Sequence, residues 1–136
     1  MEKKLLTIFG ASGLVGSSIL REALDRGYHV NGTLRNVEDQ DRIARLKNLP
    51  SGKNVNFFPA DMANVSSLDN PLKNADAAFI CCLIPTYKGF DGTPAKELDD
   101  ERGYNEIIKP TVDGCLNMLK TAKKNNVQNI LICSST

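Results

Sequence analysis

The stretch that decides the fold is Gly10-Ala11-Ser12-Gly13-Leu14-Val15-Gly16, which directly follows the apolar run Leu5-Leu6-Thr7-Ile8-Phe9. A short apolar run that stops at a glycine is typical of a buried strand. Residues 14–26 then carry hydrophobic side chains at helical spacing, and Gly27 is suited to end a helix in the left-handed conformation. The three glycines are therefore expected to join a strand to a helix through a tight turn.

Each glycine of this GxxGxxG pattern has a physical role in such a turn. Gly10 lets the chain leave the strand sharply, Gly13 leaves room for a pyrophosphate to approach backbone N–H groups, and Gly16 lets the helix pack closely on the strand. The helix N-terminus adds N–H donors and a partial positive charge. The strand–turn–helix context is the one that a dinucleotide fingerprint requires, although a tight turn without a ligand is the alternative. The residues expected at the phosphates are Gly10, Ser12, Gly13, Leu14, Val15 and Gly16.

The end of the next predicted strand, residues 29–34, bears on the choice between NAD and NADP. An acidic residue at this point would accept hydrogen bonds from the ribose 2′-hydroxyl of NAD. The chain instead has Arg35-Asn36, and a guanidinium pairs well with the additional 2′-phosphate of NADP. Glu38 and Asp39 are the nearest acids, and we place them at the start of the following helix. The sequence therefore favours NADP over NAD as the cofactor.

Strands and helices alternate along the rest of the chain. Alternating elements of this kind predict an α/β fold: a Rossmann-type doubly wound parallel sheet in the order 3-2-1-4-5, with helices on both faces, formed by one domain over residues 1–136. Pro110 is expected to bend or break the last helix. The expected strands are 4–9, 29–34, 55–58, 76–84 and 127–133, the expected helices are 14–26, 37–46, 66–73 and 98–125, and residues 85–94 are an expected loop.

The composition excludes several classes of partner. The 136 residues have a net charge of +1 and no run of more than two basic residues, so nucleic-acid binding is not expected. No apolar run approaches the roughly 20 residues of a membrane span, and the first one is too short for a signal peptide. We therefore expect a cytoplasmic protein without a membrane or nucleic-acid partner. His29 is the only histidine and the four cysteines form no CxxC pair, so we expect no metal and buried, reduced thiols.

Taken together, these segments resemble an extended short-chain dehydrogenase/reductase (the NAD-dependent epimerase/dehydratase superfamily) of the dihydroflavonol reductase and cinnamoyl-CoA reductase type. The resemblance spans the whole chain. It implies a cofactor lying across the carboxyl ends of the strands, with the segment after the fourth strand near the nicotinamide ribose. The chain departs from the family where Ile80 and Cys82 stand near positions that are often His and Ala, which puts side-chain contacts there in doubt. The segments that carry the resemblance are residues 10–16, 27–30, 32–36, 60–62, 106–114 and 127–136.

Two further groups of residues are assigned to the cofactor. Asp61 follows the third strand, where it is suited either to accept a hydrogen bond from the adenine amino group or to cap a turn, with Met62 beside the ring. The resemblance adds the segment Cys81, Cys82 and Leu83 after the fourth strand. Both assignments depend on the strand ends meeting at one edge of the sheet.

The resemblance also implies hydride transfer to a carbonyl, aided by a serine, a tyrosine and a lysine. The serine would come from the end of the fifth strand, where Ser135 is favoured over Ser134 and Thr136. The tyrosine and lysine should stand four residues apart, which no pair here satisfies. Four residues after the tyrosines stand other residues: Gly32 after Tyr28, Asp91 after Tyr87, and Ile108 after Tyr104.

We therefore expect the chain to be the NADP-binding portion of a longer reductase, truncated before the tyrosine and lysine, and inactive alone. A nucleotide-sugar epimerase or dehydratase of the same fold is an alternative, although such enzymes more often carry an acid at the Arg35 position. A non-catalytic NADP sensor or scaffold is another. The expected partner is a small carbonyl substrate, and the fifth strand as an exposed edge predicts a homodimer or aggregate.

Overall fold

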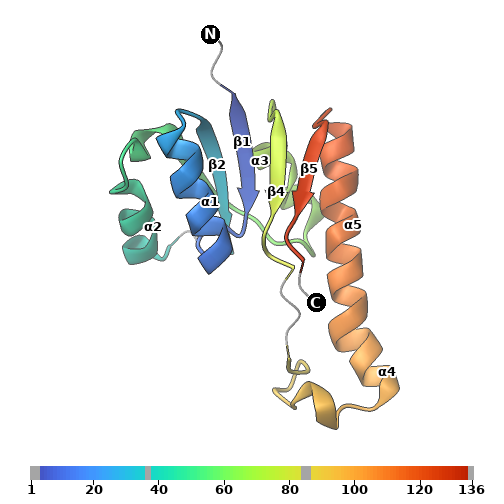
Figure 1. The fold of residues 1–136 in the computed structure, drawn as a ribbon. Coiled ribbons are helices and arrows are strands. Elements are labelled where there is room, and N and C mark those ends of the chain that lie inside the picture. Colours follow the sequence, from blue (N-terminus) through green and yellow to red (C-terminus); the bar gives the residue numbers. More distant parts are fainter. Residues whose placement is uncertain (1–3, 36–37, 84–86, 135–136) are drawn as a thin grey trace.

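The computed structural model describes residues 4–35, 38–83 and 87–134, which form a parallel sheet between two layers of helices (Figure 1). The sheet has five strands in the order β3-β2-β1-β4-β5, and every neighbouring pair is parallel. This confirms the predicted order 3-2-1-4-5. The strands are β1 Leu5–Phe9, β2 His29–Leu34, β3 Val55–Pro59, β4 Ala77–Ile80 and β5 Asn129–Ile132.

The helices cover both faces of the sheet, as predicted. Helices α1 and α2 lie on one face, while α3 and α5 lie on the other, and the segment around α4 extends beyond the carboxyl edge of the strands (Figure 1). The helices are α1 Leu14–Asp25, α2 Gln40–Lys47, α3 Asp69–Leu72, α4 Asp100–Gly103 and α5 Lys109–Lys124. Shorter helical segments are the 3-10 turns Gly52–Asn54, Val65–Ser67 and Ala95–Glu97 and the π-helix Tyr104–Ile108.

The hydrophobic core is divided by the sheet into two clusters. Successive side chains of a strand point to opposite faces, so Ile8 packs with Leu20 and Leu24 of α1 while Phe9 packs with Leu72 and Met118 on the other side. All of these side chains are at most 2% exposed. Burial on both faces explains why the central strands β1 and β4 have nearly continuous apolar sequences, whereas residues 29–34 of β2 alternate.

Several predicted elements have different boundaries, and the predicted strand 127–133 is shortened to β5 Asn129–Ile132. The predicted strand 76–84 ends at Ile80 because only residues up to Ile80 pair with β5, and Cys81–Leu83 follow as irregular backbone. The helix predicted from residue 37 begins at Gln40, since the Asp39 side chain caps it by accepting the Arg42 N–H at 3.1 Å. The predicted helix 66–73 is instead the 3-10 turn Val65–Ser67 followed by the single turn α3.

Pro110 interrupts the long predicted helix 98–125 without ending it. Helical backbone runs on from Asp100 to Lys124, but the residues just before Pro110 form the π-helix Tyr104–Ile108. A proline has no N–H for the helical ladder, and its ring meets the carbonyl of the preceding turn. The wider π turn is one way in which a helix accommodates this. The predicted bend or break is therefore a local change of helical pitch.

A pair of buried polar side chains anchors the short helix α3 beneath the sheet. Thr7 Oγ1 donates to the Pro71 carbonyl at 2.5 Å, and Asn31 Nδ2 donates to the same oxygen at 3.1 Å. Both side chains are buried, so these hydrogen bonds satisfy groups that would otherwise be costly to bury. They hold the last part of the β3–β4 crossover, just before β4, close to the centre of the sheet. Among the described residues, no helix is both long and apolar enough to cross a membrane.

Candidate functional site

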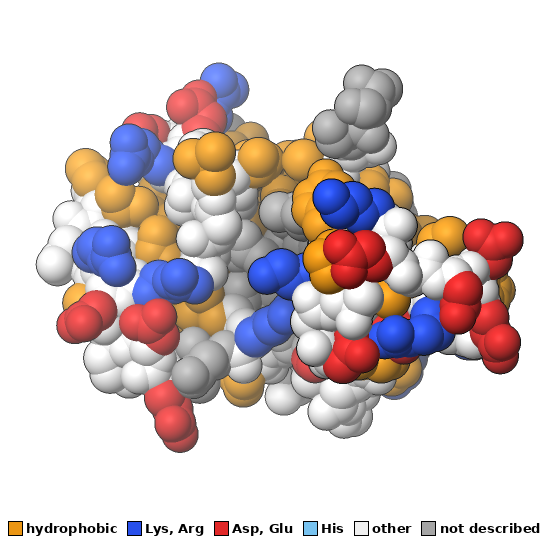
Figure 2. Space-filling view, turned by 90° about the horizontal axis from the view of Figure 1, so that it is seen from below, with side chains coloured by type: hydrophobic (Ala, Val, Ile, Leu, Met, Phe, Trp, Pro, Cys, Tyr) orange, Lys and Arg blue, Asp and Glu red, His pale blue; other side chains and the backbone are white. Residues whose placement is uncertain are grey.

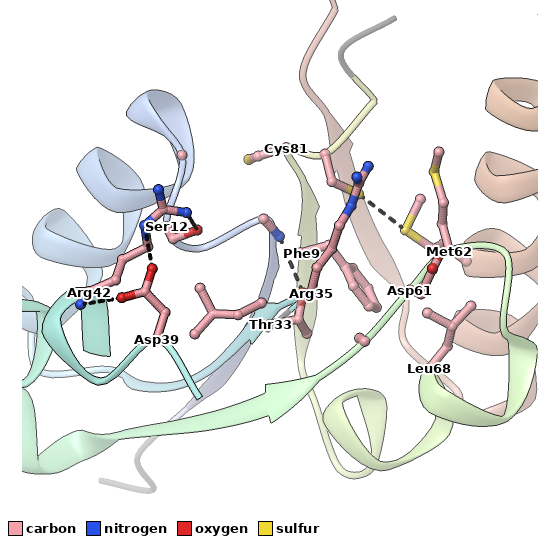
Figure 3. A pocket seen from close by; sticks show the side chains of 16 residues that line it. Phe9, Ser12, Thr33, Arg35, Asp39, Arg42, Asp61, Met62, Leu68 and Cys81 are labelled. Atoms are coloured by element: carbon pink, nitrogen blue, oxygen red, sulfur yellow. Dashed lines mark hydrogen bonds and ion pairs between the residues drawn. The ribbon is translucent and has the colours of Figure 1, made fainter. Parts of the chain in front are cut away.

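A cavity of about 350 Å³ opens at the carboxyl ends of β1, β2, β3 and β4. This is the edge where ligands bind in doubly wound sheets. Figure 2 shows this edge of the molecule, with basic side chains near the middle of the face between the two helical layers. Figure 3 shows the cavity itself, which is lined by Phe9, Gly10, Ser12, Gly13, Thr33, Leu34, Arg35, Asp39, Arg42, Ala60, Asp61, Met62, Leu68, Cys81, Cys82 and Met118.

A second and larger cavity, of about 610 Å³, lies along the face of the sheet beside α1. Its walls are mostly apolar and include Leu14, Ile19 and Phe79. It lies beside the helix rather than at the strand ends, and polar groups do not converge on it as they do on the first cavity. We therefore take the cavity at the strand ends as the candidate site.

The glycine loop forms one wall of the site and is held by β2. Gly10 has a φ of +79°, a conformation that favours glycine. Its N–H donates to Thr33 Oγ1 at 3.2 Å, and the Ala11 N–H donates to the Thr33 carbonyl at 3.0 Å. Thr33 is only 3% exposed, and these two hydrogen bonds fix the loop to the end of β2. This role of Thr33 could not be predicted from the sequence, because it depends on β2 lying beside β1.

Gly13 and Gly16 serve different purposes in this loop. A Cβ at Gly16 would overlap the carbonyl of Gly10, so a glycine is needed there for packing. A Cβ at Gly13 would meet only the Gly10 oxygen, at 3.5 Å, so no crowding within the protein requires this glycine. Gly13 also caps α1 without a side-chain hydrogen bond, which leaves the N–H groups at the start of α1 for another partner. The open side of Gly13 and the N–H groups at the start of α1 together form a surface that fits a pyrophosphate.

The side chains of Leu14 and Val15 do not line the cavity. Leu14 is 88% exposed and Val15 is 44% exposed. Both residues stand in the first turn of α1, where backbone N–H groups have no partner within the helix. Their predicted contact to phosphate therefore rests on the backbone alone.

Two arginines reach the cavity at the end of β2 and the start of α2. Arg35 is exposed and extends along the cavity wall between the glycine loop and Met62, whereas Arg42 points toward Ser12 (Figure 3). Arg42 Nη1 lies 3.5 Å from Ser12 Oγ. Sequence reasoning identified Arg35 and missed Arg42, since its direction depends on where α2 begins. Asn36 lies outside the described residues.

Asp39 lines the cavity, but its carboxylate is already occupied. It accepts the Arg42 N–H at 3.1 Å as the cap of α2, and Oδ2 lies 3.5 Å from Arg42 Nε. Its predicted place within the helix is wrong by one residue, because it precedes the first helical residue as the cap. An acid that is engaged in this way is less suited to accept hydrogen bonds from a ribose hydroxyl.

The wall opposite the glycine loop contains the Asp61-Met62 segment. Asp61 is exposed, and its Oδ1 accepts the Ala63 N–H at 2.9 Å, so it does take part in a turn. Met62 is held by α5: its carbonyl accepts Asn117 Nδ2 at 2.9 Å, and its side chain lies against Gly114. The adenine contact predicted for these residues stays a prediction.

The segment after β4 contributes two cysteines. Cys81 and Cys82 both line the cavity, whereas Leu83 packs against the core and is not part of the lining. Cys82 Sγ lies 3.8 Å from Met118 Sδ, and burial raises the pKa of Cys82 to about 11. Burial also raises the pKa of the Cys81 thiol. Both are therefore mainly protonated at neutral pH, so only a small fraction of each is the thiolate that reacts.

The remaining predicted residues are placed only in part. Ser134 is exposed just after β5, while Ser135 and Thr136 lie outside the described residues. All four cysteines are free, but the expectation that they are buried is wrong: Cys81, Cys82 and Cys115 are only partly buried, and Cys133, which follows the edge strand β5, is exposed. Within the described part of the chain no group of three or more His, Cys, Asp or Glu side chains could hold a metal ion.

Comparison with known proteins agrees with this geometry. The profile of the NmrA-like family matches residues 2–93. Dihydroflavonol 4-reductase from Solanum lycopersicum is 32% identical over 130 residues, which make up 94% of this chain and 31% of that protein. The chain thus spans about a third of the length of the curated relatives it matches. The resemblance to reductases of the dihydroflavonol type is confirmed.

Solved structures share the fold. A variant of ElxO with NADPH bound has a TM-score of 0.77 at 22% identity, covering 98% of this chain and 56% of ElxO. NmrA, a negative transcriptional regulator, has a TM-score of 0.68 in complex with NAD at 20% identity, covering all of this chain and 35% of NmrA. NmrA has also been solved in complex with NADP. At these identities the likeness shows the fold alone.

Proposed function

Because the chain belongs to the NmrA-like family, we propose that it binds a nicotinamide dinucleotide in the cavity at the strand ends, and NADP in preference to NAD. One observation carries the proposal: a helix N-terminus without a side-chain cap and two arginines line the same cavity. The first suits a pyrophosphate and the second suits an additional phosphate on the adenosine ribose. The chain's structural neighbours were solved with NADPH, NAD or NADP.

In this proposal each part of the cavity has a task. The N–H groups of Leu14 and Val15 hold the pyrophosphate, and the open side of Gly13 lets it approach. Arg35 and Arg42 bind the 2′-phosphate, with Ser12 orienting the guanidinium of Arg42. A hydrogen bond to a charged group contributes about 1.5–3 kcal/mol, so two arginines are enough to decide between the two cofactors.

The test is a calorimetric titration of the chain with NADP, NAD and adenosine 2′,5′-bisphosphate. We expect NADP to bind at least about tenfold more tightly than NAD, which corresponds to 1.4 kcal/mol. The bisphosphate should compete with NADP, because it carries the 2′-phosphate. The substitution Arg35→Ala should weaken NADP far more than NAD. Equal losses for the two cofactors would contradict the assignment.

We further propose that this chain is the cofactor-binding portion of a carbonyl reductase. When bound, NADPH would supply the hydride. Ser134, Ser135 and Thr136 follow β5, and Ser135 is our candidate for orienting the substrate carbonyl. None of the three tyrosines is followed by lysine at the fourth residue, so the residues in hand are expected to bind NADPH without consuming it. Oxidation of NADPH by this chain with an aldehyde or a dihydroflavonol would contradict that expectation.

A non-catalytic role is the second candidate. It is favoured by the likeness to NmrA, a negative transcriptional regulator that was solved with either cofactor. A binding protein of this kind would be expected to hold oxidised and reduced NADP with different affinities. Equal affinities would favour the reductase instead. An epimerase or dehydratase is less favoured, because Arg35 replaces the acid.

A further inference from the structure

Two cysteines, Cys81 and Cys133, leave neighbouring strands side by side, and Cys81 lines the cavity. Ile80 pairs with Ile132 in the parallel register of β4 and β5, so Cys81 and Cys133 are the next residues on each strand. The Cys133 N–H donates to the Ile80 carbonyl at 2.9 Å, which keeps the two chains in register beyond the last pair. The same register position places both side chains on one face of the sheet.

That face is the one covered by α1. Cys81 packs with Phe79 against the cluster that includes Ile8 and Leu20. Phe79 and Leu131 form the pair two residues earlier, and Leu131 is 50% exposed. The helical layer is therefore open above the ends of β4 and β5, and a small reagent can reach this pair of thiols.

The spacing of a sheet suits a bond between these thiols. Neighbouring strands lie about 4.8 Å apart, and a disulfide needs a Cα···Cα distance of roughly 4.4–6.8 Å. Cys133 and Cys81 are also close enough to interact electrostatically, since burial and then the nearby Cys133 raise the pKa of the Cys81 thiol. Both residues lie just outside the paired strands, where the backbone can adjust to the bond geometry.

The other two cysteines are placed differently. Cys82 points to the opposite face, with its Sγ 3.8 Å from Met118 Sδ, and burial raises the pKa of its thiol to about 11. Cys115 belongs to α5 on that same side and is half-buried. These two thiols are therefore less accessible than the exposed Cys133.

We propose that Cys81 and Cys133 form a reversible thiol–disulfide site at the ends of β4 and β5, which takes a small disulfide oxidant such as oxidised glutathione. The exposed Cys133 thiolate attacks one sulfur of the oxidant, which breaks the S–S bond and releases one glutathione thiolate. The Cys81 thiolate then attacks Cys133 Sγ and expels the second glutathione. Two protein thiols are oxidised, one glutathione disulfide is reduced to two thiols, and the two protons of the protein thiols end on the released glutathione.

The site connects to the glycine loop through Cys81. A Cβ at Gly10 would lie 3.2 Å from the Cys81 carbonyl carbon and oxygen, so the two segments are in contact range. Drawing Cys81 toward Cys133 therefore moves the wall of the cavity beside the loop. On the basis of the proposed function, bound NADP should slow disulfide formation, and the disulfide should weaken NADP binding. The disulfide itself does not depend on that function.

The experiment treats the reduced chain with oxidised glutathione, quenches with an alkylating agent, and maps peptides by mass spectrometry. We expect loss of two free thiols and a crosslink between the peptides of Cys81 and Cys133. Because Cys81 and Cys82 share a peptide, Cys82→Ser assigns the bond: the crosslink should persist in that variant and in the control Cys115→Ser. In Cys81→Ser, or Cys81→Ala if the serine variant does not fold, a glutathione adduct should accumulate on Cys133.

Several results would overturn the proposal: a lasting glutathione adduct on Cys133 while Cys81 stays free, a crosslink between Cys82 and Cys115, or a Cys133–Cys133 dimer. A repeat with NADP present separates this inference from the proposed function. If the crosslink forms equally fast with and without saturating NADP, the disulfide stands and its coupling to the cofactor cavity fails. If NADP does not bind at all, the proposed function fails while the crosslink result is unaffected.

Discussion

At the residue scale, two glycines of one loop differ in role: Gly16 is needed for packing, whereas Gly13 matters for ligand binding. Gly16 is constrained by the protein, because a Cβ there would overlap the Gly10 carbonyl. Gly13 has a φ of −73°, which any residue adopts, and space for a Cβ, so its lack of a side chain matters only for what enters the cavity. A substitution at Gly13 therefore tests binding without disturbing the fold, and one at Gly16 tests packing.

We predict opposite outcomes for alanine at these two positions. Gly13→Ala should leave the melting temperature close to that of the parent but weaken NADP by at least about tenfold. Gly16→Ala should reduce the free energy of unfolding by about 3 kcal/mol, the upper part of the range for overpacking. Thermal denaturation and calorimetry on both variants check this. Unchanged NADP affinity in Gly13→Ala would show that no phosphate approaches the loop there.

Arg42 provides a second test, with a matched control in the same helix. Arg42 points to Ser12, whereas Arg45 contacts the Asp41 carbonyl and does not line the cavity. We expect Arg42→Ala to weaken NADP by roughly tenfold to a hundredfold, the loss of a charge-assisted hydrogen bond, with little effect on NAD. Arg45→Ala should leave both affinities unchanged. A similar loss in the two variants would point to a general charge effect instead.

The residues of the site differ in how far the sequence predicts them. Gly10, Gly13 and Gly16 are predictable because their spacing reflects one local turn. Arg35 is predictable because it directly follows a strand. Thr33 and Arg42 were missed, since Thr33 acts across the β1–β2 pair and Arg42 acts from a helix whose start depends on its cap.

At the element scale, the segment before α4 is tied to the helix by a cluster of charges. Arg102 pairs with Glu106 at 2.9 Å and with Asp91 at 3.0 Å, and the Phe90 N–H donates to Glu106 Oε2 at 2.8 Å. The Glu106 side chain is only 14% exposed. It lies between the loop and the π-helix and connects the two. This cluster holds the segment that extends past the carboxyl edge of the sheet.

The cluster predicts a dependence of this loop on acid. Hydrogen bonds from Thr93, and then from Arg102, lower the pKa of Asp91 from 3.8 to about 2. Arg102 and the Phe90 N–H lower the pKa of Glu106. Because both pKa values lie below those of the unfolded chain, the stabilisation is complete only above the ordinary pKa values of 3.8 for Asp91 and 4.5 for Glu106, and it is lost as the pH falls through the lower values of the folded chain.

Carboxyl titration by NMR, together with the protection of the Phe90 amide, measures this effect. In the parent chain Asp91 should titrate near pH 2, and Phe90 protection should fall in the same range. In Arg102→Gln the pKa of Asp91 should move upward and the Phe90 amide should lose protection at higher pH. An Asp91 that titrates at its ordinary 3.8 in the parent chain would show that the loop is not held by these contacts.

The bounds of a helix or strand were predictable from the sequence where a single local pattern determines them. β2 matches the alternation of residues 29–34, and Gly27 adopts a φ of +83° as expected for a helix end. The end of β4 was not predictable, because the apolar residues continue past Ile80 while pairing with β5 stops there. The π-helix was expected only as an irregularity, since the presence of Pro110 does not say how the turn before it adjusts.

At the scale of the whole molecule, the strand order follows from right-handed crossovers and was predicted from the alternation of strands and helices. The sequence predicted exposed apolar surface at the edge strand of the sheet, but not elsewhere on the molecule. β5 pairs with β4 alone among the described strands, and Leu131 and Ile132 are 50% and 45% exposed. An edge strand with exposed hydrophobic side chains is a template for another strand.

We therefore expect the chain to associate with itself through β5 as its concentration rises. Light scattering across a concentration series should show dimers or larger species in the parent chain. Leu131→Lys should reduce this association, since a charge on an edge strand discourages pairing. Val65→Lys is the matched control: Val65 is 53% exposed but lies in a 3-10 turn far from β5 in sequence, so association should persist. A parent chain that stays monomeric at high concentration would show that β5 does not recruit a partner strand.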